Sequence, residues 1–125
     1  MSKGITLWFT GLSGAGKSAI ADEVERRLAA RGERVQRLDG DMLRETLCKD
    51  LGFSREDRDK NIERASIVAG FLTRNDVITL ATFISPFRGQ RELAAKTIKP
   101  FGAFFEAWVK CAIETCIERD PKGLY

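Results

Sequence analysis

The sequence predicts an α/β protein in which helices pack on both faces of a parallel sheet. Short apolar runs alternate with longer amphipathic segments along the 125 residues, in the order β-α-β-(α)-α-β-α-β-α. The first and third runs are apolar almost throughout, as is typical of strands that are covered on both faces. A chain of this length has room for one core, so we expect residues 1–125 to form a single domain.

Four short apolar runs are the expected strands. They occupy residues 5–10, 33–39, 77–83 and 103–109. Ligands of parallel sheets bind beyond the carboxyl ends of the strands, so functional residues are expected just after each of these runs.

The first expected helix begins at Lys17. It places Ile20, Val24 and Leu28 on one face and stops at Gly32, a residue type that is common directly after helix ends.

The longest expected helix covers residues 54–76. It begins with Ser54 and has Asp57 three residues later, a variant of the capping box. One stripe of this helix is apolar and consists of Ile62, Ala65, Ala69 and Leu72. Two shorter helices are expected over residues 88–98 and 112–119, each ending before a proline.

Composition excludes several classes of function. A formal net charge of +3 fits a small anionic ligand but falls short of the basic face of a nucleic-acid binder, so no nucleic-acid partner is expected. The chain has no histidine, which excludes histidine-based acid–base chemistry. No run approaches the roughly 20 apolar residues of a membrane span, and no signal peptide is evident, so no membrane association is expected.

The cysteines indicate the compartment. Cys48, Cys111 and Cys116 are odd in number and lack CxxC spacing, which argues against a zinc site or a disulfide framework. We therefore expect reduced thiols that serve in packing, and a cytoplasmic protein.

One short motif indicates phosphate chemistry. Residues 11–18, GLSGAGKS, match GxxxxGK[ST] between an expected strand and an expected helix, which is the context of a P-loop. Glycine permits positive φ, so backbone N–H groups can surround phosphate oxygens. Lys17 can reach the β and γ phosphates, and the Ser18 hydroxyl can bind Mg²⁺. The candidate nucleotide-binding residues are Gly11, Ser13, Gly14, Ala15, Gly16, Lys17 and Ser18.

An acidic pair follows the second expected strand. Asp39 and Asp41 lie at the ligand edge of the sheet, where carboxylates can hold the water shell of a metal or accept a proton from an attacking hydroxyl. Without histidine they are the candidates for either task, although an ordinary turn would look the same.

Cationic and polar residues follow. Arg44 comes one helical turn after Asp41, and Arg58 and Asn61 are spaced i, i+3 on one helix face. Guanidinium groups suit sulfate or phosphate oxygens, although solvated helix charge is the alternative. Ser85 lies directly after the third strand, where a Ser-Pro pair could equally end a strand.

Taken together, the segments GLSGAGKS, LDGD, LGFSREDRDKNIER, ATFISPFR and ERDPKGLY resemble the adenylylsulfate kinase family, in register over nearly the whole chain. The resemblance implies a P-loop NTPase-type fold. It also implies transfer of the γ-phosphate of ATP, with Mg²⁺, to the ribose 3′-hydroxyl of adenosine 5′-phosphosulfate (APS). The product would be 3′-phosphoadenosine 5′-phosphosulfate (PAPS), in sulfate assimilation.

The resemblance also implies residue roles. Lys17 would act on the phosphates, Asp41 would orient the 3′-hydroxyl and serve the metal with Ser18, and Asp39 would support it. Ser85 corresponds to a serine that is phosphorylated in some members, and Arg119 lies in the segment that flanks the ATP adenine. The implied substrate-binding residues are Asp39, Asp41, Arg44, Phe53 (stacked on the substrate adenine), Arg58, Asn61, Ile84, Ser85 and Lys122.

The chain departs from the family in three places. Met42 replaces an asparagine, which removes a polar contact, and VKCAI (109–113) replaces a VDVPL-like step before Arg119. The family continues after RDPKGLY into a basic lid and a last strand and helix, which these 125 residues lack; we expect them to belong to sequence beyond Tyr125. The resemblance further implies a homodimer and a fusion or association with ATP sulfurylase.

Two other interpretations stay open. A non-catalytic domain that senses PAPS is one, although the intact Gly16, Lys17 and Ser18 favour catalysis. A P-loop kinase for another small metabolite is the second, and it would require the other segments to match by chance. A GTPase is disfavoured because no NKxD tetrapeptide occurs.

Overall fold

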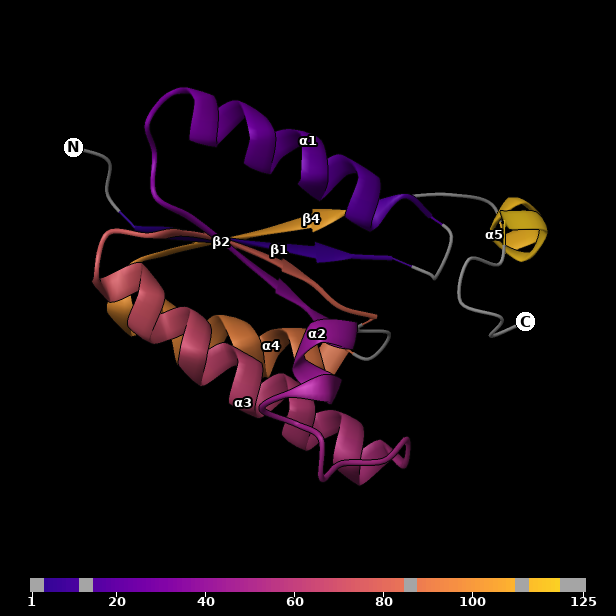
Figure 1. Cartoon of the computed structure of the whole chain (residues 1–125). Coiled ribbons are helices and arrows are strands. Elements are labelled where there is room, and N and C mark those ends of the chain that lie inside the picture. The colour runs from indigo at the N-terminus through magenta and orange to yellow at the C-terminus, as the bar shows by residue number, and fades with distance from the viewer. Residues whose placement is uncertain (1–3, 12–14, 85–87, 110–112, 120–125) are drawn as a thin grey trace.

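A central sheet of four parallel strands organises the chain (Figure 1). The computed structural model describes residues 4–11, 15–84, 88–109 and 113–119. The strand order is β2-β3-β1-β4. The strands are β1 (Ile5–Thr10), β2 (Val35–Asp39), β3 (Ile78–Thr82) and β4 (Ala103–Trp108). The expected α/β class with a parallel sheet is confirmed.

Helices cover both faces of the sheet, as expected. In Figure 1, α1 lies on one side of the sheet and α3 and α4 lie on the other. The helical elements are α1 (Lys17–Ala30), α2 (Gly40–Glu45), α3 (Arg55–Arg74), α4 (Arg88–Ile98), the 3-10 turn η1 (Lys99–Phe101) and α5 (Ile113–Arg119). The short helix that the sequence left optional between the second strand and the long helix is α2. Within the described ranges, no helix is both long enough and apolar enough to cross a membrane.

The element boundaries differ slightly from the expected ones. β2 begins at Val35 rather than at residue 33, because the turn that ends α1 continues through Gly32, at φ +79°, to Glu33, whose N–H donates to Leu28 O. β3 and β4 are shorter than expected by a residue at one or both ends. α3 ends at Arg74, since the N–H of Val77 already closes back onto Leu72 O.

Each face of the sheet has its own apolar cluster. The cluster under α3 and α4 includes Trp8, Ile62, Ala65 and Ala69, with Leu72 partly buried beside it, so the predicted stripe of α3 is confirmed. Trp8 stacks on Phe83 with ring centroids 5.0 Å apart. The other buried members of this cluster are Leu38, Leu43, Cys48, Ala81, Phe83, Ala94 and Ile98.

The prediction of which α1 residues face the sheet is partly wrong. Ile20 is 44% exposed, whereas Ala21 is buried with Val24 and Leu28 packed around it. The helix is therefore rotated so that positions i, i+3 and i+7 counted from Ala21 face the sheet.

Cys48 serves in packing, as expected. It is fully buried and free, and burial raises the pKa of its thiol, so it is a neutral core side chain. Cys111 and the side chain of Cys116 lie outside the described residues.

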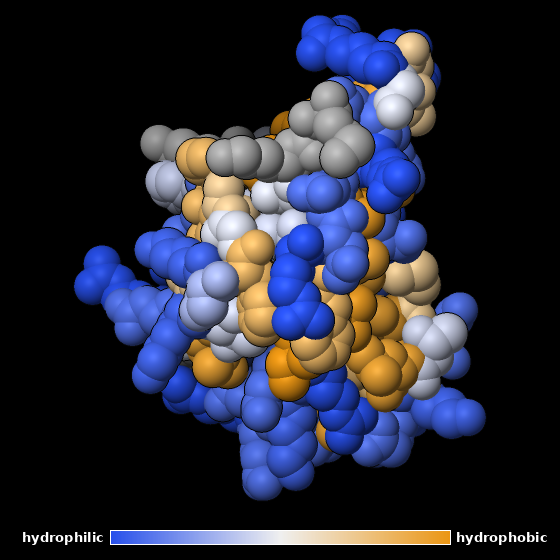
Figure 2. Space-filling view, turned by 90° about the vertical axis from the view of Figure 1, so that its left-hand side faces the viewer, coloured by the Kyte–Doolittle hydropathy of each residue, from blue (hydrophilic) through white to orange (hydrophobic). Residues whose placement is uncertain are grey.

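The amino end of the sheet is tightly packed against α3. The hydroxyls of Thr6 on β1 and Thr73 on α3 share a buried hydrogen bond of 2.6 Å. Figure 2 looks onto this end, where hydrophobic and hydrophilic residues are interspersed on the surface. The carboxyl end lies on the opposite side of the molecule, where the strand arrows of Figure 1 point.

Candidate functional site

A cavity of about 770 Å³ opens at the carboxyl end of the sheet, within the size range of small-molecule sites. The register explains its place: Phe9 and Asp39 both pair with Thr82, so β1 and β2 end within one residue of each other on either side of β3. Because β3 lies between β1 and β2, the segments that follow these two strands start about 10 Å apart, which leaves room for a phosphoryl group beyond the strand ends. The lining residues are Gly16, Lys17, Ser18, Ala19, Asp39, Gly40, Asp41, Arg44, Phe53, Arg58, Asn61, Ile62, Thr82, Phe83, Ile84 and Arg119.

The turn between β1 and α1 forms one wall. Gly16 takes φ +105° and ψ 13°, and a Cβ added to it would meet no atom within 4 Å. The first turn of α1 contains no acidic residue, so the partial positive charge of this helix end is not offset within that turn. Lys17 is 8% exposed and donates from Nζ to Gly11 O at 2.7 Å. This wall suits a polyanion.

The acidic pair forms the facing wall. Oδ1 of Asp39 accepts the backbone N–H of Asp41 at 3.0 Å, which caps α2. Oδ2 of Asp39 lies 3.7 Å from the guanidinium of Arg37, which is also paired with Asp22 of α1. Asp39 therefore supports the start of α2 and leaves Asp41, an exposed residue of its first turn, at the cavity.

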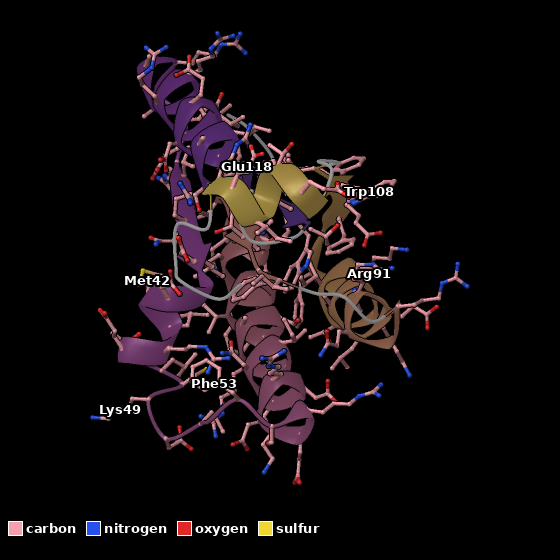
Figure 3. All side chains as sticks on the ribbon, turned by 90° about the vertical axis from the view of Figure 1, so that its right-hand side faces the viewer. Met42, Lys49, Phe53, Arg91, Trp108 and Glu118 are labelled. Carbon is pink, nitrogen blue, oxygen red and sulfur yellow. The ribbon has the colours of Figure 1, made fainter. Side chains whose placement is uncertain are left out.

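Arg44 and Phe53 form a pair at the cavity. The guanidinium carbon of Arg44 lies 4.2 Å from the centroid of the Phe53 ring, and its NH1 donates to Gly52 O at 3.0 Å. Phe53 is 68% exposed and lies between the α2 side of the molecule and α3 in Figure 3. An exposed ring backed by a fixed cation is suited to stacking on a planar ligand group.

Helix α3 contributes Arg58 and Asn61 to the same cavity. Asn61 is 4% exposed, and its Oδ1 is buried without a hydrogen-bond partner among the described residues. The i, i+3 spacing brings both side chains to one face, as the sequence predicted.

The remaining candidates have mixed placements. Ile84, after β3, and Arg119, on α5, line the cavity, whereas Gly11 and Ala15 belong to the P-loop turn but not to the lining. Ser13, Gly14, Ser85 and Lys122 lie outside the described residues. Met42 is 38% exposed on the outer side of α2 in Figure 3 and is not one of the lining residues.

Five lining residues were missed by the sequence analysis: Ala19, Gly40, Ile62, Thr82 and Phe83. Thr82 and Phe83 had a usable signal, because they directly precede the ligand-edge Ile84. Gly40 had another, because it stands between the two candidate residues Asp39 and Asp41.

No cluster of three or more His, Cys, Asp or Glu side chains that could hold a metal ion occurs among the described residues. Mg²⁺ does not require one, since it is commonly bound through one or two protein oxygens together with phosphate oxygens and water. The oxygens of Ser18 and Asp41, both at the cavity, are the hard ligands that Mg²⁺ prefers.

The chain is similar to proteins of one known family. The family model described as adenylylsulphate kinase matches residues 3–125. The chain is 57% identical to an adenylyl-sulfate kinase of Halothermothrix orenii over 98% of this chain and 65% of that protein. It is 51% identical to the bifunctional enzyme NodQ of Azospirillum brasilense over 95% of this chain and 19% of that protein.

Among solved structures, the Mycobacterium tuberculosis APS kinase in complex with AMPPNP and APS superposes with a TM-score of 0.95 at 45% identity, covering 100% of this chain and 73% of that one. The chain spans less than two thirds of the length of the two curated relatives named above. From the family match and these identities, the chain belongs to the adenylylsulphate kinase family.

Proposed function

We propose that this protein transfers the γ-phosphate of ATP to the ribose 3′-hydroxyl of APS and so produces PAPS for sulfate assimilation. The observation that carries the proposal is that one cavity is lined both by Lys17 and Ser18 of the P-loop and by Asp41 from across the sheet. The family relatives share this activity by name, and the M. tuberculosis enzyme binds an ATP analogue and APS.

The P-loop wall would hold ATP. Its backbone N–H groups and Lys17 would bind the terminal phosphates, and Arg119 would lie beside the adenine. Ser18 and Asp41 would hold Mg²⁺, which when bound neutralises charge on the β and γ phosphates. Ala15, Gly11 and, as unchanged predictions, Ser13 and Gly14 complete this wall.

The facing wall would hold the acceptor. Asp41 would accept the hydrogen bond of the 3′-hydroxyl and direct its oxygen toward the γ-phosphorus. The O3′–P bond forms as the bond from that phosphorus to the β-phosphate oxygen breaks, ADP leaves, and the hydroxyl proton is released. Little covalent work falls to the protein, so positioning and charge neutralisation supply the rate.

Arg44, Arg58 and Asn61 would bind the phosphosulfate group, Phe53 would stack on the adenine, and Ile84 would be a further substrate contact. Lys122 remains a predicted substrate contact. Ser85 remains a predicted site of phosphorylation and is not required, because direct transfer needs no phosphoenzyme.

Partners and location extend the proposal. The NodQ relative is bifunctional by name, which supports fusion of such a domain to a second enzyme; that this enzyme is ATP sulfurylase is proposed from the family resemblance alone. A homodimer is proposed from the family resemblance alone. A cytoplasmic location is proposed because Cys48 is a free thiol.

The test is a coupled ADP-release assay on the full-length protein with and without APS. Wild type should release ADP only when APS is present. Lys17→Ala and Asp41→Ala should each lower kcat/KM by about 100-fold or more, as expected for groups that stabilise transition-state charge or orient the attacking oxygen. Lys96→Ala removes an exposed lysine of α4 away from the cavity and should leave the rate unchanged.

Two results would oppose this function. Absence of APS-dependent ADP release from wild type would exclude the kinase. Tight PAPS binding without turnover would instead establish the non-catalytic sensor.

A further inference from the structure

The start of α3 departs from an ordinary capping box. Ser54 Oγ accepts the N–H of Asp57 at 3.1 Å, which is the expected half of the motif. The carboxylate of Asp57 does not return to Ser54. Its Oδ2 accepts instead the N–H of Gly52, two residues before the helix cap, at 2.8 Å. The acid therefore holds the segment in front of the helix.

Gly52 connects the Asp57 carboxylate to residues that line the cavity. Its N–H is held by Asp57, and its carbonyl accepts NH1 of Arg44 at 3.0 Å. Arg44 in turn lies against the ring of the next residue, Phe53, 4.2 Å from its centroid. A continuous chain of contacts thus links the Asp57 carboxylate to both members of the stacked pair.

Burial alone does not hold Phe53. The ring is 68% exposed, so apolar packing restrains it weakly and the backbone on either side must set its position. Ser54 on one side is fixed as the helix cap, and Gly52 on the other is fixed by Asp57. Glycine at position 52 also keeps the approach open, since a Cβ there would stand 3.2 Å from the Asp57 carboxylate.

The earlier part of the loop between α2 and α3 is anchored separately. Arg64 binds Asp50 through both nitrogens, at 2.7 and 3.1 Å, and donates to Leu47 O at 3.2 Å. The Arg64 guanidinium lowers the pKa of Asp50, and Cys48 is buried in the core. Residues 47–50 are thus fixed on α3, and Asp57 restrains the part that carries the ring.

We propose that Asp57 is a positioning residue for acceptor binding: it fixes Gly52 so that the Arg44–Phe53 pair stands ready at the cavity before APS arrives. The inference rests on the proposed function, because it assigns Arg44 and Phe53 to APS. A loop that is ordered in advance loses less freedom when ligand binds, so the benefit lies in acceptor affinity and not in the phosphoryl-transfer step.

The test compares Asp57→Ala with Asp57→Asn in the full-length protein. Asp57→Ala should raise the KM for APS about tenfold, as expected for loss of a hydrogen bond to a charged group, with kcat and the KM for ATP changed less than about twofold. Asp57→Asn keeps an oxygen that can accept from Gly52 and should restore the KM for APS to within about threefold of wild type.

Two neighbouring variants separate positioning from helix stability. Ser54→Ala removes the cap of α3, and Glu56→Ala removes a negative charge from the same first turn. Neither side chain contacts Gly52. Glu56→Ala should therefore leave the KM for APS unchanged. Ser54→Ala loosens the other anchor of Phe53 and should raise this KM much less than Asp57→Ala does, even where thermal melting shows a less stable protein. An equal rise in KM in Ser54→Ala would overturn the proposal, because a frayed helix start would then explain Asp57→Ala.

A measurement without substrate completes the test. Hydrogen exchange of the Gly52 amide should be faster in Asp57→Ala and unchanged in Glu56→Ala. Unchanged Gly52 exchange, or an unchanged KM for APS in Asp57→Ala, would overturn the proposal. A wild-type protein that neither binds nor turns over APS would instead overturn the proposed function, and the inference would fall with it.

Discussion

The two ends of β1 place glycine in opposite surroundings. Beyond its carboxyl end, Gly16 takes φ +105° and faces open space, with no atom within 4 Å of where a Cβ would stand. Before its amino end, a Cβ on Gly4 would lie 1.8 Å from the backbone oxygen of Thr73 on α3. The first glycine permits an unusual backbone conformation and leaves room for a ligand, whereas the second permits a strand and a helix to touch.

Two further glycines at the amino end, Gly102 and Gly70, are closely packed, as Gly4 is. A Cβ on Gly102 would lie 2.5 Å from the Thr73 side chain, and one on Gly70 would lie 2.7 Å from the ring of Phe101. Together with the buried Thr6–Thr73 hydrogen bond, these contacts make this end a packed structural region. Substitutions at the two ends should therefore separate stability from function.

The largest expected effect is on stability at the amino end. Gly4→Ala should lower the free energy of unfolding by about 3 kcal/mol, because β1 and α3 must move apart to admit the methyl group. Chemical denaturation measures this, and kcat/KM well below the melting temperature should be unchanged. Gly89→Ala, in a helix with nothing near its Cβ, is the matched control and should not destabilise the protein. Equal denaturation midpoints for Gly4→Ala and wild type would refute the packing argument.

The next effect is on nucleotide binding at the carboxyl end. Gly16→Ala strains a positive-φ position by about 1 kcal/mol or more and shifts the N–H groups of the P-loop. The affinity for a non-hydrolysable ATP analogue, measured by calorimetry, should fall about tenfold or more.

Gly32→Ala is the control for backbone strain. Gly32 also has positive φ and open space around it, but it lies at the far end of α1. Gly32→Ala should lose about as much stability as Gly16→Ala but should keep the wild-type affinity for the ATP analogue. Equal losses of affinity in the two variants would show that general strain, and not the loss of the proposed phosphate contacts, is responsible.

The smallest effect concerns α1, which runs between the two ends. The pKa of Glu23 is lowered from 4.5 to about 2, mainly by a hydrogen bond from Arg26 and, to a smaller extent, by one from Arg27. The folded state therefore holds this proton less tightly than the unfolded state, so the stabilisation is complete above pH 4.5 and is lost as pH falls toward 2.

Glu23→Gln should flatten the acid dependence of stability in that window by a small amount, since the ion pairs are exposed, and leave activity unchanged. Circular dichroism during denaturation at several pH values measures it. Glu63→Gln, an exposed glutamate on α3, serves as reference, and a slope equal to wild type in Glu23→Gln would show that these pairs contribute nothing.

Local patterns explain why much of the fold was predictable. The apolar runs identified the four strands, and the stripe through Ile62, Ala65 and Ala69 identified the buried face of α3. On α1 the same reasoning chose Ile20 where Ala21 is buried, because periodicity alone does not set the rotation of a helix against the sheet.

The site was predictable to a similar extent. The P-loop and the acidic pair were found because each is a run of neighbouring residues at the end of a strand. Thr82 and Phe83 were missed although they directly precede Ile84, because the sequence analysis placed the functional residues beyond the strand ends, whereas the last residue of β3 and the one after it also line the cavity.

The residues alone specify the β1–turn–α1 cradle, because its glycines, Lys17 and Ser18 lie within eight consecutive positions and their chemistry is local. Folding alone brings Asp41, Asn61 and Arg119 to that cradle and turns the Asp57 carboxylate toward Gly52 rather than toward its own helix cap. Such contacts depend on how separate segments pack. The spacing of residues along the chain does not determine which distant segments come together in space.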